Sequence, residues 1–334
     1  MSQSNRTVVV AKRASGIPGA ENFRLVDRER PVPPPGGAVV RIRYAAVDPA
    51  MRGWLSAEPN YFTVPDGEVM RSHAVGEVIE CDSAHWRTGD WVYGFFGWQE
   101  FYAATEDQFI WKIDRDVAPA PVWLGPLGLN GITAWLGFRH FARPKAGETV
   151  LVSTAAGGVG SVVGQLAKAG DVRAVGLTSG SDKVALAIEE FGYEKAIDYK
   201  AAGDLTSAIA FACPQGIDIY YDNVGGEIAD AAFANLRRGG RIIQCGTASI
   251  ESWIPTPVGP RRERDMLVKR LSWNGFVALD HSDLFPTALA DLTALYRQAK
   301  LKSREEVLEG LDAAPTAVQR LYSGQNHGRL CIAL

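Results

Sequence analysis

Apolar positions in the first part of the chain occur in short runs that turn-forming residues separate. Runs rich in β-branched residues, at 7–11 and 38–44, predict strands. The proline- and glycine-rich stretch 30–37 between them predicts a turn or an extended loop. Runs at 75–80 and 91–96 have the same character, so the chain up to about residue 121 is expected to form a β-rich domain.

The pattern changes near residue 122, and from Glu148 onward apolar strands alternate with helical stretches. This alternation predicts a parallel sheet with right-handed crossovers, so the expected fold class is α/β with a Rossmann-type doubly wound sheet. The apolar tail 328–334 is expected to return as a strand. The expected strands are 149–153, 173–178, 217–222, 241–246 and 271–277, and the expected helices are 158–169 and 182–191, with further helical segments to about residue 311.

Bulk properties narrow the classes of function. A chain of 334 residues suggests two domains, and 46% hydrophobic with 22% charged residues is typical of a globular protein. We find no apolar run of about 18 residues, which argues against a membrane span. A net charge of -3 gives no electrostatic reason to expect nucleic acid, and the polar N-terminus lacks a secretory signal. The expected compartment is the cytoplasm.

The residues that usually bind metals are scattered. Cys81, Cys213, Cys245 and Cys331 form no Cys-x-x-Cys pair, and the five histidines show no ligand spacing. We therefore expect neither a metal site nor disulfides.

A glycine cluster lies where a predicted strand runs into a predicted helix. Residues 155–160 read Ala-Ala-Gly-Gly-Val-Gly, an A-x-G-x-x-G pattern. A pyrophosphate needs close approach to the backbone at such a turn, and a Cβ would hold it off. The pattern favours a dinucleotide site, and the alternative is a merely tight turn between strand and helix.

The end of the second strand of this unit bears on the choice of cofactor. NAD-binding proteins usually place Asp or Glu there, whereas this chain has Thr178 followed by Ser181 and Lys183. A hydroxyl and an ammonium suit a 2′-phosphate, so NADP(H) is the predicted cofactor. In the alternative interpretation Ser181 is a helix N-cap and Lys183 a solvated lysine.

Several ordered motifs resemble the zinc-independent reductases of the medium-chain dehydrogenase/reductase superfamily, in the group of prostaglandin reductases, leukotriene B4 12-hydroxydehydrogenase and alkenal double-bond reductases. The resemblance covers nearly the whole chain. The motifs are 47–53, 128–135, the glycine turn with 162–168, 220–226, 240–246, 275–277 and 324–329.

The resemblance implies roles for individual residues. Lys183 and Tyr199 match residues that hold the 2′-phosphate, and Asn326 matches a late cofactor contact. Phe276 and Val277 match a segment that faces the nicotinamide, although they could equally be core residues. The full implied cofactor set is Thr133, Gly157, Gly158, Val159, Gly160, Ser181, Lys183, Tyr199, Asn223, Cys245, Gly246, Phe276, Val277 and Asn326.

The resemblance also implies a split architecture and an assembly. A GroES-like, β-rich catalytic domain would take residues 1–121 and 312–334, with the Rossmann domain at 122–311 between them. The family pattern further implies a homodimer that forms through the edge strand at 271–277.

Two departures from the family pattern affect the substrate pocket. Ala50 stands where the family has Tyr, and the stretch after Gly246 lacks the Ser-Gln-Tyr-Asn that is common in the family. The expected substrate-contacting residues are Met51, Tyr61, Glu251 and Trp253, and the sequence indicates no general acid, so the catalytic residue is unknown.

The expected activity is NADPH-dependent reduction of the carbon–carbon double bond of a small unsaturated aldehyde or ketone. The alternatives are a quinone reductase of the same superfamily and a non-catalytic NADPH-binding protein.

Overall fold

The computed structural model describes residues 4–58 and 60–334 of the chain. It divides the chain into two compact units. One consists of Met1–Leu124 with Arg304–Leu334, and the other of Gly125–Ser303. None of the helices in the described part is long and apolar enough to cross a membrane.

The first unit is built mainly from antiparallel strands. A seven-stranded sheet has the order β14-β15-β3-β4-β5-β7, with β6 also paired to β3, and β1 and β2 form a separate hairpin. Only β14 and β15 run parallel in the larger sheet. The strands are β1 Ser4–Val10, β2 Phe23–Glu29, β3 Ala38–Ala46, β4 Ala74–Cys81, β5 Trp91–Gly94, β6 Phe101–Ala104, β7 Ile110–Lys112, β14 Glu305–Glu309 and β15 Arg329–Ala333, and the helices are η1 Ala20–Asn22, α1 Ala50–Leu55, η2 Ala120–Leu124, η5 Leu311–Ala313 and α9 Ala314–Tyr322.

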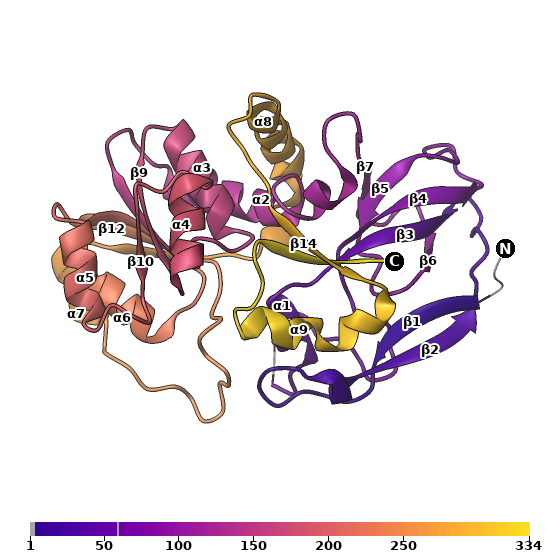
Figure 1. Cartoon of the computed structure of the whole chain (residues 1–334), viewed down its shortest axis with the longest axis horizontal. Helices are drawn as coiled ribbons and strands as arrows, with labels where there is room; N and C mark the ends of the chain where they lie inside the picture. The colour runs from indigo at the N-terminus through magenta and orange to yellow at the C-terminus, as the bar shows by residue number, and fades with distance from the viewer. Residues whose placement is uncertain (1–3, 59) are drawn as a thin grey trace. The chain divides into compact units, whose positions relative to one another are not determined.

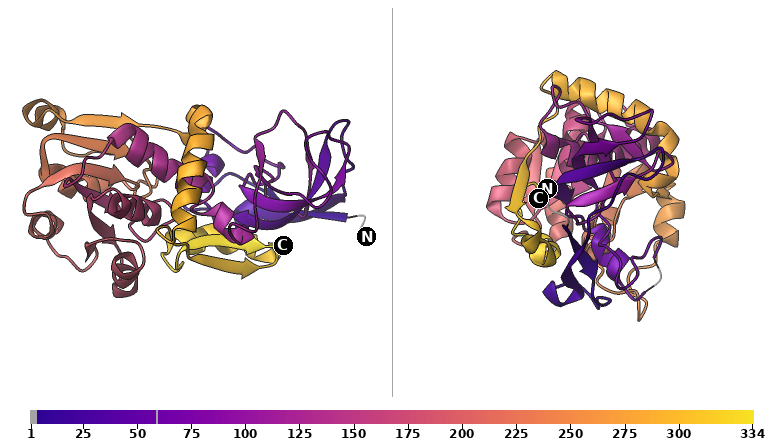
Figure 2. Two further views of the ribbon diagram at one scale, coloured as in Figure 1. Left: turned by 90° about the horizontal axis from the view of Figure 1, so that it is seen from above. Right: turned by 90° about the vertical axis from the view of Figure 1, so that its right-hand side faces the viewer.

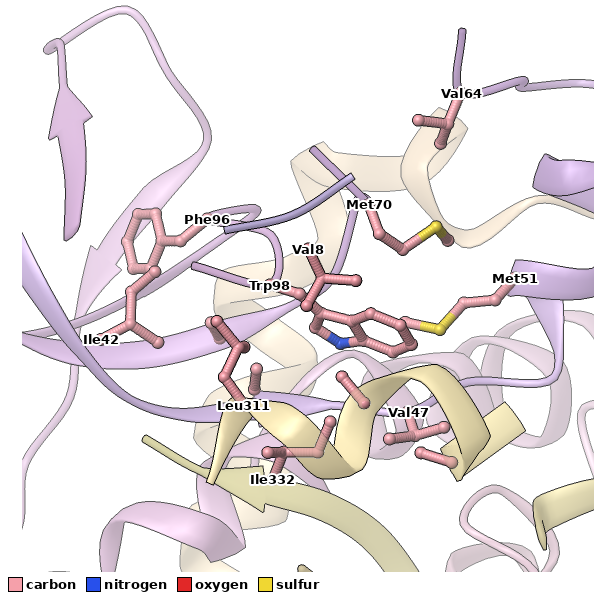
Figure 3. Close-up of a cluster of buried hydrophobic side chains, with 14 of the residues drawn as sticks. Val8, Ile42, Val47, Met51, Val64, Met70, Phe96, Trp98, Leu311 and Ile332 are labelled. Atoms are coloured by element: carbon pink, nitrogen blue, oxygen red, sulfur yellow. The ribbon is translucent and has the colours of Figure 1, made fainter. Parts of the chain in front are cut away.

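The core of this unit joins its two stretches of chain. The C-terminal strand β15 pairs with β3, so the yellow end of the chain lies against the indigo strands (Figures 1 and 2). Ile332 of β15 and Met51 of α1 belong to one buried cluster (Figure 3). Trp98 lies in the same cluster, and its indole N–H donates to the carbonyl of Ala46 at 3.0 Å. The only polar atom of this fully buried side chain therefore has a hydrogen-bond partner.

The second unit is a parallel sheet of six strands in the order β10-β9-β8-β11-β12-β13. The order reverses at β8, which is the arrangement of a Rossmann-type sheet. The strands are β8 Thr149–Ser153, β9 Arg173–Thr178, β10 Lys195–Asp198, β11 Ile217–Asp222, β12 Leu236–Gln244 and β13 Ser272–Gly275, and the helices are α2 Leu129–Trp135, η3 Leu136–Ala142, α3 Gly160–Ala169, α4 Ser181–Glu189, α5 Leu205–Ala212, α6 Gly226–Ala234, α7 Glu263–Lys269, η4 Ala278–Leu284 and α8 Phe285–Arg297.

Both faces of this sheet are covered. Leu151 packs in a cluster with Ile209 of α5 and Phe233 of α6, helices that lie together in Figure 1. Val150 and Val152 are fully buried as well, and alternation along the strand turns them to the opposite face. A strand buried on both faces reads as a continuous apolar run, which is why the sequence predicts β8 so clearly.

The predicted fold class is confirmed, and the strands expected at 149–153, 173–178 and 217–222 coincide with β8, β9 and β11. The expectation of helix up to residue 311 is wrong, because Glu305–Glu309 form β14. Its three glutamates favour helix locally, but at the edge of a sheet Glu309 is exposed, Glu306 pairs with Arg320, and the backbone pairs with β15. The first compact unit resumes at Arg304. The domain bounds 1–121 with 312–334 and 122–311 stay a prediction.

Candidate functional site

The glycine turn lies at the carboxyl end of β8. Gly157 donates its N–H to the carbonyl of Thr154 at 2.9 Å, and α3 begins at Gly160. A Cβ on Gly160 would lie 2.2 Å from the Thr154 carbonyl oxygen, and one on Gly157 would lie 2.7 Å from the Thr154 side chain. The turn therefore tolerates no side chain at these positions, and Gly158 and Val159 between them are half-buried. This tight cradle before a helix N-terminus fits a pyrophosphate.

The residues expected at a 2′-phosphate gather at the ends of two neighbouring strands. β9 ends at Thr178, which pairs with Asp198 at the end of β10. Tyr199 follows directly and donates its backbone N–H to the Thr178 carbonyl at 3.0 Å. Ser181 is the exposed first residue of α4, with Gly180 at the N-cap, and Lys183 is half-buried two residues further along the first turn. Ser181 is thus not the cap that the alternative interpretation required.

Asp222, at the end of β11, organises the middle of this edge. Its carboxylate is fully buried, and Oδ1 accepts from the N–H groups of Val224 and Gly225 and the hydroxyl of Tyr220, each at 2.9 Å. Oδ2 accepts from the side-chain amide of Gln244 on β12 at 3.1 Å. One carboxylate therefore ties the end of β11 to the turn that follows it and to the neighbouring strand.

No role was expected for Asp222 from the sequence. It lies within the motif 220–226, and the available signal was an acidic residue at the end of a buried strand, directly before Asn-Val-Gly-Gly.

Asn223 and the end of β12 depend on that arrangement. The Asn223 side-chain amide donates to the carbonyl of Ser153 at 2.7 Å, and its backbone N–H donates to the Ser153 hydroxyl at 2.8 Å. Cys245 and Gly246 both donate backbone N–H groups to the Asp222 carbonyl. A Cβ on Gly246 would lie 2.8 Å from the Asn223 carbonyl, so this turn too requires glycine. The structure thus brings Asn223, Cys245 and Gly246 together beside β8.

Cys245 is not built as a nucleophile. Burial raises the pKa of its thiol to about 12. The thiol is therefore protonated at neutral pH, and its place in the site is that of a small packed side chain.

The remaining cofactor candidates of the second unit lie on other elements. Thr133 is half-buried on α2, and its carbonyl accepts from the Tyr221 hydroxyl at 3.0 Å. Phe276 and Val277 follow β13 and are half-buried, with the Phe276 ring 5.1 Å from that of Phe141. Glu251 and Trp253, expected to contact substrate, are exposed in the long loop after Gly246.

Three candidates lie in the first unit. Asn326 is buried, and its side-chain amide donates to the carbonyl of Gly328 at 2.9 Å. Tyr61 is 60% exposed, and its hydroxyl accepts from the indole N–H of Trp54 at 3.2 Å. Met51 is fully buried in the core, so its contribution to a substrate pocket stays a proposal.

A buried ion pair anchors the segment that carries Met51. Arg329 on β15 donates from both terminal nitrogens to the two carboxylate oxygens of Asp48, at 2.6 and 3.1 Å. It also donates to the carbonyls of Val47 and Leu124. Burial works to raise the pKa of Asp48, but the charge and hydrogen bonds of Arg329 outweigh it and hold that pKa below its ordinary value.

Residues 4–58 and 60–334 contain no group of three or more His, Cys, Asp and Glu side chains placed to hold a metal ion.

A glycine turn at the switch point of a parallel sheet, in a chain that also contains a β-rich unit, is the architecture of a dinucleotide-binding oxidoreductase. Comparison with known families agrees. Residues 6–113 match a family described as the N-terminal domain of oxidoreductase, and residues 158–294 match one described as zinc-binding dehydrogenase.

Individual proteins are similar over almost their full length. The chain is 37% identical to the NADPH-dependent curcumin reductase of Escherichia coli, covering 99% of this chain and 97% of that protein. It is 35% identical to the NADP(+)-dependent 2-alkenal reductase of Nicotiana tabacum, covering 98% and 96%. The crystal structure of CurA from Vibrio vulnificus in complex with NADPH matches with a TM-score of 0.91, 35% identity and 98% coverage of both chains.

The chain belongs to the zinc-independent reductases of the medium-chain dehydrogenase/reductase superfamily.

Proposed function

We propose that this oxidoreductase uses NADPH to reduce the carbon–carbon double bond of α,β-unsaturated aldehydes or ketones. The observation that carries the proposal is the carboxyl edge of the parallel sheet. A glycine cradle that excludes a Cβ at Gly157 and Gly160 lies there beside β9, which ends in Thr178 rather than in an acidic residue and is followed by Ser181 and Lys183, with Tyr199 at the end of the next strand. The type of reaction is inferred from the names of the relatives, one of which is a 2-alkenal reductase.

The residues present fit NADP(H) as the cofactor. The cradle at Gly157 and Gly160 would take the pyrophosphate, and Lys183 with Tyr199 would take the 2′-phosphate. Asn223, Cys245 and Gly246, held by Asp222, would border the ribose on the nicotinamide side. Thr133, Phe276, Val277 and Asn326 complete the proposed set.

Bound NADPH would supply a hydride for the substrate β-carbon, and a proton at the α-carbon would complete the reduction. The protein must orient the substrate and provide donors near its carbonyl oxygen. Tyr61, Glu251 and Trp253 are exposed polar or aromatic side chains proposed for this positioning. Cys245 is excluded as a neutral-pH nucleophile because burial raises its pKa to about 12.

Turnover with a substrate panel tests the activity. Oxidation of NADPH should be fast with enals and enones, slow with quinones and unaffected by exhaustive chelation. Turnover with quinones alone would contradict the proposed activity and show that the protein is a quinone reductase. NADPH binding without turnover of any compound would indicate a non-catalytic protein.

Replacement of Lys183 tests the cofactor assignment. Lys183→Ala should weaken NADPH binding about 10- to 150-fold and NADH binding hardly at all, because a charge-assisted contact contributes about 1.5–3 kcal/mol. Tyr199→Phe should lose less, since a neutral hydroxyl contributes about 0.5–1.5 kcal/mol. Lys195→Ala is the matched control, because Lys195 starts β10 at the opposite end of the strand. An unchanged ratio of the two affinities in Lys183→Ala would contradict the assignment.

We also propose that the protein forms a homodimer through β13 and that it is located in the cytoplasm. β13 pairs only with β12 and so leaves one edge of the sheet open. Trp273 on this strand is 46% exposed, and Leu267 and Val268 on neighbouring α7 are exposed as well. An open strand edge beside exposed apolar side chains favours self-association. Trp273→Glu should shift the sedimentation coefficient from dimer to monomer at micromolar concentration, and a wild-type monomer would refute the proposal.

A further inference from the structure

Arg71, which shortly precedes β4, lies among three aromatic rings of the first unit that form a clamp around its guanidinium. Its guanidinium carbon is 3.9 Å from the centre of the Phe62 ring and 4.0 Å from that of Phe95, with the Trp54 ring at 5.7 Å. Two rings at this distance hold the guanidinium through cation–π attraction. The clamp fixes the position of the cation without using its N–H groups.

Arg71 has no acidic partner among residues 4–58 and 60–334. Its Nε is buried and lacks any hydrogen-bond partner, and no ion pair or hydrogen bond joins the terminal nitrogens to another described residue. Two other arginines of the unit differ, since Arg329 pairs with Asp48 and Arg43 with Glu77. A guanidinium stays charged in proteins, so Arg71 is a positioned cation that still needs an acceptor.

The clamp adjoins a residue already proposed to contact substrate. Tyr61 interacts electrostatically with Arg71, and its hydroxyl accepts from Trp54, which is itself a wall of the clamp. Tyr61 is 60% exposed and Arg71 is only partly buried, so a bound molecule can reach both.

We propose that Arg71 is a specificity-determining residue that binds a carboxylate carried by the unsaturated carbonyl substrate, an inference that rests on the proposed function. A carboxylate matches the planar edge of a guanidinium and can take two parallel hydrogen bonds from it. Such a charge-assisted contact is stronger than a hydrogen bond between neutral groups. The preferred substrates are therefore acidic enones or enals rather than neutral ones.

A pair of substrates that differ only in charge tests this directly. Benzoylacrylate and its methyl ester share the same enone, and only the acid can pair with Arg71. Wild type should show higher kcat/KM for the acid, and Arg71→Gln should lower the acid-to-ester ratio about 10- to 100-fold. Arg71→Lys keeps the charge but loses the planar fork, so its acid-to-ester ratio should lie between those of wild type and Arg71→Gln. This variant also shows whether the lower ratio of Arg71→Gln comes from a folding defect.

The matched control is Arg115→Gln. Arg115 is an exposed arginine 4.3 Å from the Trp91 ring centre, so the variant removes a similar cation–π contact and the same charge, and the ratio should not change. The affinity of Arg71→Gln for NADPH should also equal that of wild type.

Calorimetry with the saturated acid, benzoylpropionate, and its methyl ester separates this proposal from the proposed function. Wild type with NADP+ should bind the acid more tightly, and Arg71→Gln should remove the difference, whether or not either unsaturated compound is reduced. Equal binding of acid and ester by wild type would overturn the role of Arg71. Weaker NADPH binding by Arg71→Gln with an unchanged acid-to-ester ratio would overturn it too, because Arg71 would then serve a phosphate of the cofactor.

Discussion

Arg329→Met is expected to cost about 3–5 kcal/mol of the free energy of unfolding, because it leaves the Asp48 carboxylate buried without its partner. The same substitution also leaves the carbonyls of Val47 and Leu124 without their donor. Since domains are typically stable by about 5–15 kcal/mol, the loss is a large fraction of the total. Urea denaturation of both proteins measures it.

The partner variants show whether the ion pair is the cause. Asp48→Leu alone should also be strongly destabilising, because Arg329 would then be the unpaired buried charge. The double variant should lose clearly less than the sum of the two single variants, which is the signature of coupled residues. Additive losses, or a loss below about 1 kcal/mol in Arg329→Met, would contradict this account.

Asp222→Ala should cost at least about 3 kcal/mol and should also weaken NADPH binding. It removes the acceptor for the buried N–H groups of Val224 and Gly225 and for the Tyr220 hydroxyl, and an unsatisfied buried donor costs about 1–3 kcal/mol. Asn223 and Gly246 are positioned by the same turn, so the cofactor site should lose its shape. Thermal unfolding and NADPH titration measure the two effects.

Asp222→Asn is the informative control for this prediction. An amide keeps one oxygen that can take over the four bonds to Oδ1, and mainly the contact with Gln244 is lost. We expect a smaller loss than in Asp222→Ala for both stability and affinity. Equal behaviour of the two variants would show that the negative charge, rather than the set of accepted hydrogen bonds, organises this edge.

The sequence predicted those parts of the molecule that local pattern determines. β8 and β9 are nearly continuous apolar runs because both faces are buried, and the glycine turn can be recognised because the close approach of the backbone requires glycine. β14 was missed because its glutamates favour helix locally and only pairing with β15 makes it a strand.

The polar centres could not be predicted in the same way. Asp48 and Arg329 meet only because β15 returns to pair with β3. The five acceptor contacts of Asp222 come from residues on three strands and a turn. The clamp around Arg71 likewise unites residues from separate segments. Such sites depend on tertiary packing, which no short stretch of sequence specifies.

The most direct test of the proposed reaction follows the hydride itself. NADPH deuterated at C4 of the nicotinamide should transfer its deuterium to the β-carbon of a simple enone, and NMR of the product should show a saturated ketone labelled only there. Deuterium on the carbonyl carbon of an unsaturated alcohol would contradict the account, because the enzyme would then reduce the carbonyl and leave the double bond intact.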